Sequence, residues 1–131
     1  MRERVLIDTD VLIDHLRGRA DARAYLEAEV RSIAVSALTV AERHVGVREG
    51  AERQALAALL ELFAEVVPLE ASDAVRGGLY RRDYGRTHGT GLVDACLAAQ
   101  AERTGAEVVT LNARHFPMLS ADALHVPYEK A

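Results

Sequence analysis

VLIDTDVLIDHLRG, residues 5–18, begins with three apolar residues and leads directly into two aspartates, Asp8 and Asp10. A short apolar run that ends in polar residues and is followed by apolar residues at helical spacing predicts a buried strand leading into a helix. Thr9 is predicted to cap that helix with its hydroxyl, and Asp10 to stabilise the helix dipole from the first turn. The aspartate pair is therefore a candidate for a structural turn, a phosphoryl-accepting nucleophile or a metal site.

The rest of the chain repeats this alternation of short apolar runs and helical segments. Strands are predicted at 5–7, 33–35, 65–69 and 108–111, with a weaker one at 124–126, and helices at 10–16, 21–30, 37–47, 51–64, 72–84 and 92–103. Ser36 and Thr90 are predicted helix caps, and 84–91 is predicted to be a break between helices. The pattern indicates a three-layer α/β/α fold with a mostly parallel central sheet of four to five strands.

Composition limits the classes of protein to which the chain can belong. Its 131 residues, half of them apolar, suffice for one core, so residues 1–131 are expected to form a single domain. No apolar run approaches the roughly 20 residues that span a bilayer, and the N-terminal residues lack the pattern of a secretory signal. We therefore expect a cytoplasmic protein with no membrane partner. The lone cysteine, Cys96, is predicted to be a small core residue. The chain has no CxxC or HExxH spacing for zinc, so any metal is expected to be bound by oxygen ligands.

Three acids and one amide stand out against the predicted fold. Asp8 and Asn112 each follow a predicted strand, at the end of a parallel sheet where ligands bind. Asp94 is the only charged residue between 92 and 101, with no basic partner nearby, and we favour function over a helix-dipole role for it. Glu42 has two interpretations: its own surroundings favour an exposed surface residue, whereas its helical spacing from Leu38 would turn it inward.

A cluster of Asp8, Asp94 and Glu42 without a basic residue would need a cation to be stable. Oxygen ligands suit Mg²⁺ or Mn²⁺, which keep several waters and recruit substrate phosphates. The chemistry that this cluster implies is hydrolysis of a phosphodiester by a metal-activated water, with a nearby carboxylate accepting the proton.

Other enzyme classes fit the sequence less well. DTDVL also resembles the first motif of haloacid-dehalogenase-type (HAD-type) phosphatases, but those enzymes and response-regulator receivers need a lysine at the site. The only lysine is Lys130, beyond the last predicted strand. The spacings of a Ser–His–Asp set or a glycine-rich phosphate loop are also missing.

The order of these residues along the whole chain resembles the PIN domain, specifically the VapC-type toxins of bacterial toxin–antitoxin pairs. Three segments of this chain look like the family's motifs: DTDVLIDHLRG at 8–18, AERHVG at 41–46 and GLVDACLAAQAERTGAEVVTLNARHFP at 91–117. The resemblance implies a site in which Asp8, Glu42 and Asp94 hold the metal and Asn112 joins them in catalysis. Asn112 stands where many members carry a fourth acid, which puts a second metal in doubt. Thr9 and Asp10 are then left to support the site or the helix N-terminus.

The resemblance further implies a Mg²⁺-dependent endoribonuclease, with Mn²⁺ as the other metal, that a cognate antitoxin inhibits. It also implies a homodimer and a toxin–antitoxin hetero-oligomer. The net charge of −4 argues against a dedicated nucleic-acid-binding domain, so RNA contact is expected to be local. Candidate contacts to substrate phosphates are Arg81, Arg82, Arg86, Arg114 and His115; a solvated helix face is an equal alternative for any one of the arginines. The competing function is a catalytically silent PIN-like module that binds RNA or protein. The presence of Asp8, Glu42 and Asp94 argues against it, because a binding module has no use for an uncompensated cluster of acids.

Overall fold

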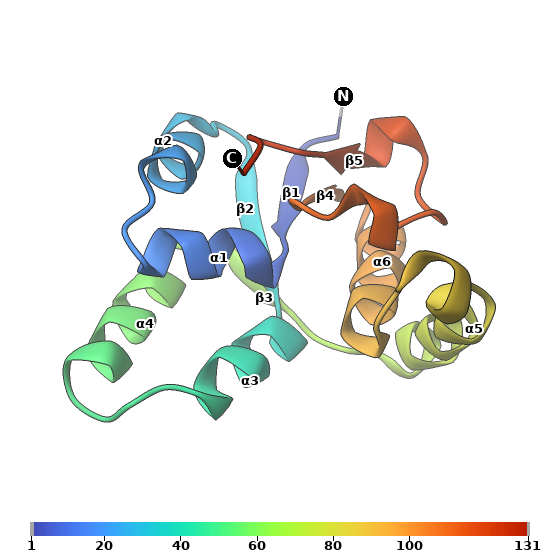
Figure 1. Ribbon diagram of the computed structural model, residues 1–131, viewed down its shortest axis with the longest axis horizontal. Coiled ribbons are helices and arrows are strands. Elements are labelled where there is room, and N and C mark those ends of the chain that lie inside the picture. The colour runs from blue at the N-terminus through green and yellow to red at the C-terminus, as the bar shows by residue number, and fades with distance from the viewer. Residues whose placement is uncertain (1, 131) are drawn as a thin grey trace.

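A five-stranded sheet, in the order β3-β2-β1-β4-β5, forms the centre of the computed structural model, which describes residues 2–130 (Figure 1). Every pair of neighbouring strands is parallel. The strands are β1 (Arg4–Ile7), β2 (Ser32–Ser36), β3 (Glu65–Val67), β4 (Glu107–Val109) and β5 (Leu124–His125). The helices are α1 (Thr9–Leu16), α2 (Ala20–Ala28), α3 (Ala37–Val45), α4 (Ala51–Glu61), α5 (Ala71–His88) and α6 (Leu92–Thr104), with 3₁₀ turns η1 (Ala113–His115) and η2 (Ala121–Ala123).

Two hydrophobic cores lie on opposite faces of the sheet. Because side chains alternate along a strand, Leu6 packs with Leu97 and Ala98 of α6, whereas Val5 and Ile7 pack with α1 and α4 on the other face. Both faces are thereby covered by helices, which explains why the strands are almost continuously apolar. The predicted three-layer α/β fold is confirmed, and the sheet is fully rather than mostly parallel. None of the helices in residues 2–130 is both long and apolar enough to cross a membrane.

The sheet order brings the carboxyl ends of β1 and β4 side by side. Ile7 is in register with Val109, and the backbone N–H of Asp8 donates to the Val109 carbonyl at 2.9 Å. The residues that follow these two strands therefore meet at one edge of the sheet, as expected for Asp8 and Asn112.

Several predicted boundaries were wrong. The predicted break at 84–91 is mostly helix, because α5 continues to His88 and ends at Gly89, which has the left-handed φ of 67°. The ring of Tyr84 packs one turn away from the rings of both Tyr80 and His88, which favours the helical spacing through this stretch. Strand β3 ends at Val67 rather than 69, because Pro68 has no N–H to donate to a neighbouring strand.

The predicted caps were right at one helix and wrong at two. The Ser36 hydroxyl accepts from the Leu38 N–H at the start of α3, as expected. Helix α1 is capped by Asp8 rather than Thr9, because the Asp8 carboxylate accepts from the Thr9 N–H at 2.7 Å. Helix α6 begins after Gly91, and the Thr90 hydroxyl instead donates to the His115 carbonyl at 2.8 Å.

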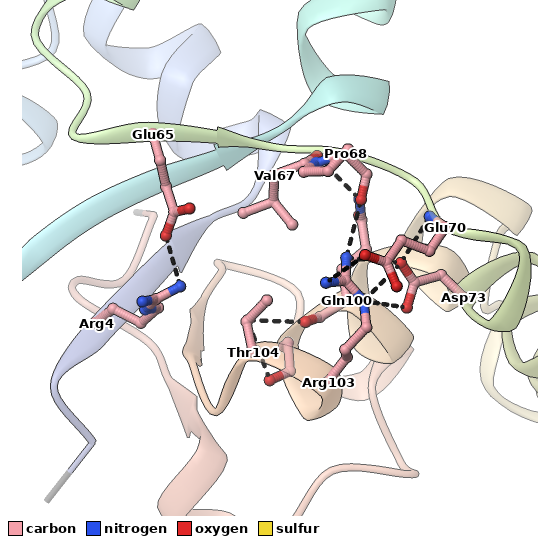
Figure 2. Close-up of polar contacts among 10 residues, drawn as sticks. Arg4, Glu65, Val67, Pro68, Glu70, Asp73, Gln100, Arg103 and Thr104 are labelled. Atoms are coloured by element: carbon pink, nitrogen blue, oxygen red, sulfur yellow. Dashed lines mark hydrogen bonds and ion pairs between the residues drawn. The ribbon is translucent and has the colours of Figure 1, made fainter.

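A buried polar network holds α6 against the sheet. The Gln100 amide is fully buried, and its nitrogen donates to the carbonyls of Val67 and Pro68, at 3.2 Å and 3.1 Å (Figure 2). Its oxygen accepts from the Ser36 hydroxyl at 2.6 Å. These bonds attach α6 to the ends of β2 and β3. Cys96 of the same helix is buried, as predicted. Because Asp94 belongs to this helix, the network also sets the position of that carboxylate.

A second polar cluster joins β2 to β4 through the turn that follows α2. The Arg31 guanidinium lies 2.8 Å from a Glu29 carboxylate oxygen and 3.2 Å from Glu107, and the Tyr25 hydroxyl donates to Glu29 at 3.0 Å. The bonds from Arg31 lower the pKa of Glu29 to about 2.

We expect Glu29→Gln to lower the free energy of unfolding at pH 7 by about 2 kcal/mol, because the half-buried Arg31 guanidinium loses the closer of its two charged acceptors. The pKa of Glu29 is lower in the folded protein, so the stabilisation is complete above the ordinary pKa of 4.5 and is lost as the pH falls toward 2. Urea unfolding of both proteins at pH 7, 4 and 3 would test this. A difference that stays constant over that range would contradict it.

Candidate active site

A cavity of about 460 Å³ lies where β1 and β4 end. It is lined by residues from α1, α3, the start of α6 and the segment after β4: Asp8, Thr9, Asp10, Ile13, Glu42, Gly91, Leu92, Val93, Asp94, Asn112 and His115. The fold therefore brings together all the acids and the amide predicted from sequence, although they span more than 100 positions of the chain.

Asp8 is the most deeply placed acid of the cavity, at 6% exposure. One carboxylate oxygen accepts from the Thr9 N–H and the other from the Thr110 hydroxyl, both at 2.7 Å. Burial and the charges of Asp10 and Asp94 nevertheless raise the pKa of Asp8 to about 7, against the lowering by these two hydrogen bonds. An ionised Asp8 is therefore held at a cost in free energy unless a cation is present.

Asp10 belongs to the same cluster and also fixes the chain after β4. One of its oxygens accepts from the Leu111 N–H at 2.9 Å and from the Asn112 amide at 3.0 Å. The other oxygen is buried and has no hydrogen-bond partner among the described residues. Burial raises the pKa of this carboxyl. Asp10 is thus more than a first-turn acid, because it contacts the residues after β4 and has a free oxygen.

Asp94 lies in the first turn of α6 and is half-buried. Its carboxylate is 3.3 Å from His115 Nδ1, a partner that comes from a distant segment of the chain and not from the neighbouring sequence. The short turn η1 brings His115 close, and the hydrogen bond from Thr90 to the His115 backbone holds it there. Burial raises the pKa of Asp94, with further raising by Asp10 and Glu42, while His115 opposes the shift.

Glu42 combines its two predicted interpretations, since it is exposed and also lines the cavity. It extends from α3, and one carboxylate oxygen accepts from the Thr9 hydroxyl at 2.9 Å. Thr9, which does not cap its helix with this hydroxyl, therefore connects the acid on α3 to the start of α1.

The predicted basic residues divide into two groups. His115 lines the cavity, whereas the four exposed arginines do not: Arg81, Arg82, Arg86 and Arg114. Arg82 pairs with its neighbour Asp83 at 2.9 Å. The lysine required by the HAD-type phosphatase alternative is also elsewhere, because Lys130 Nζ binds the buried Asp14 at 2.9 Å.

Thr110 was not identified from the sequence as a site residue. It is fully buried; its hydroxyl donates to Asp8 and accepts from the Asn112 N–H at 3.0 Å. The available signal was a hydroxyl in the otherwise apolar run VVTL, where a buried polar group needs a partner. Asn112 uses its amide nitrogen for Asp10, which leaves its carbonyl oxygen for a ligand.

The cavity brings carboxylates together without enclosing a preformed ion site. Among residues 2–130, no three Asp, Glu, His or Cys side chains are arranged closely enough to hold a metal by themselves. A cation here would take its remaining ligands from water or from a bound anion, which is how Mg²⁺ is commonly held.

Comparison with known proteins places this architecture in a family. The PIN domain pattern matches residues 5–120. Ribonuclease VapC10 of Mycobacterium tuberculosis is 40% identical over 117 residues, 87% of this chain and 86% of that protein. Ribonuclease VapC19 of the same organism is 43% identical over 120 residues, 86% of this chain and 92% of that protein.

Solved structures agree with the sequence relatives. The toxin–antitoxin complex from Klebsiella pneumoniae contains a chain with a TM-score of 0.80 and 28% identity, covering 96% of this chain and 99% of that one. FitAcB from Neisseria gonorrhoeae has a TM-score of 0.69 and 26% identity, and the match covers 94% of this chain and 97% of that one. With the matching fold, the family pattern and two VapC relatives in agreement, the chain belongs to the PIN domain family and to its VapC-type members.

Proposed function

We propose that this protein is a Mg²⁺-dependent endoribonuclease and the toxin of a toxin–antitoxin pair. The observation that carries the proposal is the gathering of Asp8, Asp10, Glu42 and Asp94 around one cavity at the carboxyl end of the sheet. The relatives named ribonucleases, at 40% and 43% identity, support RNA as the substrate.

The residues of the cavity fit a hard divalent cation. All four acids offer carboxylate oxygens, Asp8 is penalised in its charged form, and one Asp10 oxygen is buried without a partner. Mg²⁺ or Mn²⁺ suits such donors, and would be held by Asp8 and Asp94, with Glu42 as the third acid at the exposed side. When bound, the ion would lower the pKa of a water and neutralise charge on the phosphate oxygens.

The remaining residues of the site would orient the groups and transfer a proton. Asp10 has a free oxygen next to the other acids and would accept the proton of the attacking water. Thr110 holds the Asp8 carboxylate, and Thr9 holds Glu42, so each of these acids keeps one oxygen in a defined direction. Asn112 would orient the water or the phosphate through its carbonyl oxygen.

The proposed partners follow from the structural relatives. A cognate antitoxin would block the cavity in the cytoplasm, since the similar chain from K. pneumoniae belongs to a toxin–antitoxin complex. A toxin homodimer would form the centre of the hetero-oligomer. Exposed apolar side chains such as Leu92, 58% exposed beside the cavity, and Val45, 88% exposed on α3, are available for such contacts.

The alternative of a catalytically silent PIN-like module is less well supported. A binding module gains nothing from a buried Asp8 whose charge is opposed by burial and by neighbouring acids. We therefore favour the enzyme.

We expect the purified protein to cleave 5′-labelled RNA with Mg²⁺ or Mn²⁺ and to lose that cleavage in EDTA. If water is the nucleophile, an RNA with 2′-O-methyl groups is still cut, because the neighbouring 2′-hydroxyl takes no part. Asp94→Asn is the matched inactive variant, since it keeps the shape of the side chain and removes the charge. Absence of cleavage with either metal, or cleavage by Asp94→Asn at the wild-type rate, would refute the proposal.

A further inference from the structure

The second half of α5 carries a row of three rings in contact, tilted or edge-to-face, that ends beside the active site. The ring centroids of Tyr80 and Tyr84 are 6.3 Å apart, and those of Tyr84 and His88 are 5.7 Å apart with an edge-to-face angle of 82°. All three side chains are half-buried. His88 is followed by Gly89, where a Cβ would lie 3.4 Å from the His115 ring, so the row approaches a residue that lines the catalytic cavity.

A glycine within the same helix provides the space for an arginine. Gly85 lies in the interior of α5, where glycine is unfavourable relative to alanine. A Cβ at this position would overlap the guanidinium of Arg81, which lies against the bare backbone. Arg81 makes no ion pair within residues 2–130, in contrast to Arg82, which pairs with Asp83. The bare backbone at Gly85 therefore leaves room for an unneutralised guanidinium beside the row of rings, and a side chain here would displace it.

We infer that Arg81, Tyr84 and His88 form a subsite for the single-stranded RNA that flanks the cleaved bond. Arg81 would bind a phosphate, and Tyr84 with His88 would present ring faces and edges on which an unpaired base stacks. This subsite rests on the proposed function, because it names how the RNA substrate is held.

Charge favours RNA as the occupant of this face. The second half of α5 holds three arginines and one aspartate in a chain with a net charge of −4, so it is locally positive on an acidic protein. A row of aromatic rings needs bases that are free to stack, which selects single-stranded over double-stranded RNA. The subsite also explains how a polyanionic RNA can bind next to an acidic cavity, since the positively charged arginines lie beside the cavity rather than in it.

The test is the binding of a fluorescein-labelled single-stranded RNA of about 12 nucleotides, with the same sequence as a duplex for comparison, to the Asp8→Asn protein. This background prevents cleavage, so that binding is measured by itself. We expect Tyr84→Leu and Arg81→Gln to weaken single-strand binding about tenfold each, and Arg81→Gln to reduce the slope of log affinity against log salt by about 0.7.

Two matched controls separate the subsite from general effects. Gly85→Ala displaces Arg81 and is expected to weaken binding about fivefold, whereas Gly78→Ala, in the same helix with open space around it, leaves binding unchanged. Arg23→Gln removes an exposed arginine of α2, which pairs with Glu27, and tests for a nonspecific effect of charge. It is expected to change affinity less than twofold.

The outcomes distinguish failure of the RNA subsite from failure of the proposed nuclease function. If the Asp8→Asn protein binds no RNA, or if Tyr84→Leu and Arg81→Gln bind as tightly as it does, the subsite is refuted. A change of sedimentation coefficient in these variants, without a change in RNA affinity, would make this face a contact between two copies and also refute it. If binding falls as expected but the wild-type protein cuts no RNA, Arg81, Tyr84 and His88 stand as a site that binds single-stranded RNA, and the proposed nuclease function fails.

Discussion

Asp8→Asn is expected to reduce RNA cleavage at least about a thousandfold and at the same time to stabilise the metal-free protein by about 2 kcal/mol. The two effects have one cause, the charge of a carboxylate that is only 6% exposed. In the proposed function that charge holds a cation, whereas in the metal-free protein it is disfavoured by burial and repelled by Asp10 and Asp94. Function and stability therefore oppose each other at this residue.

The surrounding hydrogen bonds can accommodate the amide. The asparagine oxygen can accept from the Thr9 N–H, and its nitrogen can donate to the Thr110 hydroxyl, which lies 3.3 Å from an Asp10 oxygen and can donate to it. The Thr9 N–H and the Thr110 hydroxyl each keep an acceptor, so the two hydrogen bonds that Asp8 makes are replaced rather than lost when the charge is removed.

Urea unfolding in EDTA and in Mg²⁺ would measure the stability change. Mg²⁺ is expected to stabilise the wild-type protein and to have little effect on Asp8→Asn, because a ligand stabilises only the state that binds it. The pKa of Asp8 is raised, so the advantage of the variant in EDTA should grow from pH 4 to about 7 and then level off. Glu61→Gln, at the exposed end of α4, is the control and should change stability by less than about 0.5 kcal/mol. A destabilised Asp8→Asn protein that still cleaves RNA would contradict the assignment.

Arg103→Ala is expected to lower the free energy of unfolding by about 3 kcal/mol. The Arg103 guanidinium binds both carboxylate oxygens of Asp73, at 3.0 Å and 2.9 Å, and also donates to the Pro68 carbonyl at 2.9 Å (Figure 2). Asp73 is 2% exposed, so removing the guanidinium leaves a buried charge whose remaining bond is to the Glu70 N–H. Although burial raises the pKa of Asp73, the bonds from Arg103 lower it overall.

The double variant Asp73→Asn, Arg103→Ala separates the pair from the packing of the arginine. It should recover part of the loss, because the uncompensated charge is gone. Arg76→Ala is the control, since Arg76 makes an exposed ion pair with Glu102 at 3.6 Å and should cost less than about 1 kcal/mol. Urea unfolding at pH 7 measures all three. A loss below about 1 kcal/mol in Arg103→Ala would show that Asp73 does not depend on this arginine.

The order and type of the main elements were predictable from local patterns. The apolar run before Asp8 and the helical spacing after it are properties of neighbouring residues, and burial on both faces of a sheet makes such runs continuous. The same logic placed Asp8 and Asn112 at strand ends and identified Asp94 as an unusual charge in an apolar helix. The break predicted at 84–91 failed because glycines and polar residues suggest a turn, whereas the contacts between rings one turn apart on α5 favour the helix.

The sequence by itself determined which acids and which amide stand out against the fold, and on or beside which elements they lie. Only the tertiary structure decided their partners, because β1 and β4 are neighbours in the sheet although about 100 residues separate them. That neighbourhood joins Asp10 to Asn112 and Thr110 to Asp8, and the turn after β4 brings His115 to Asp94. These contacts follow from strand order and packing between distant segments, which local periodicity does not contain.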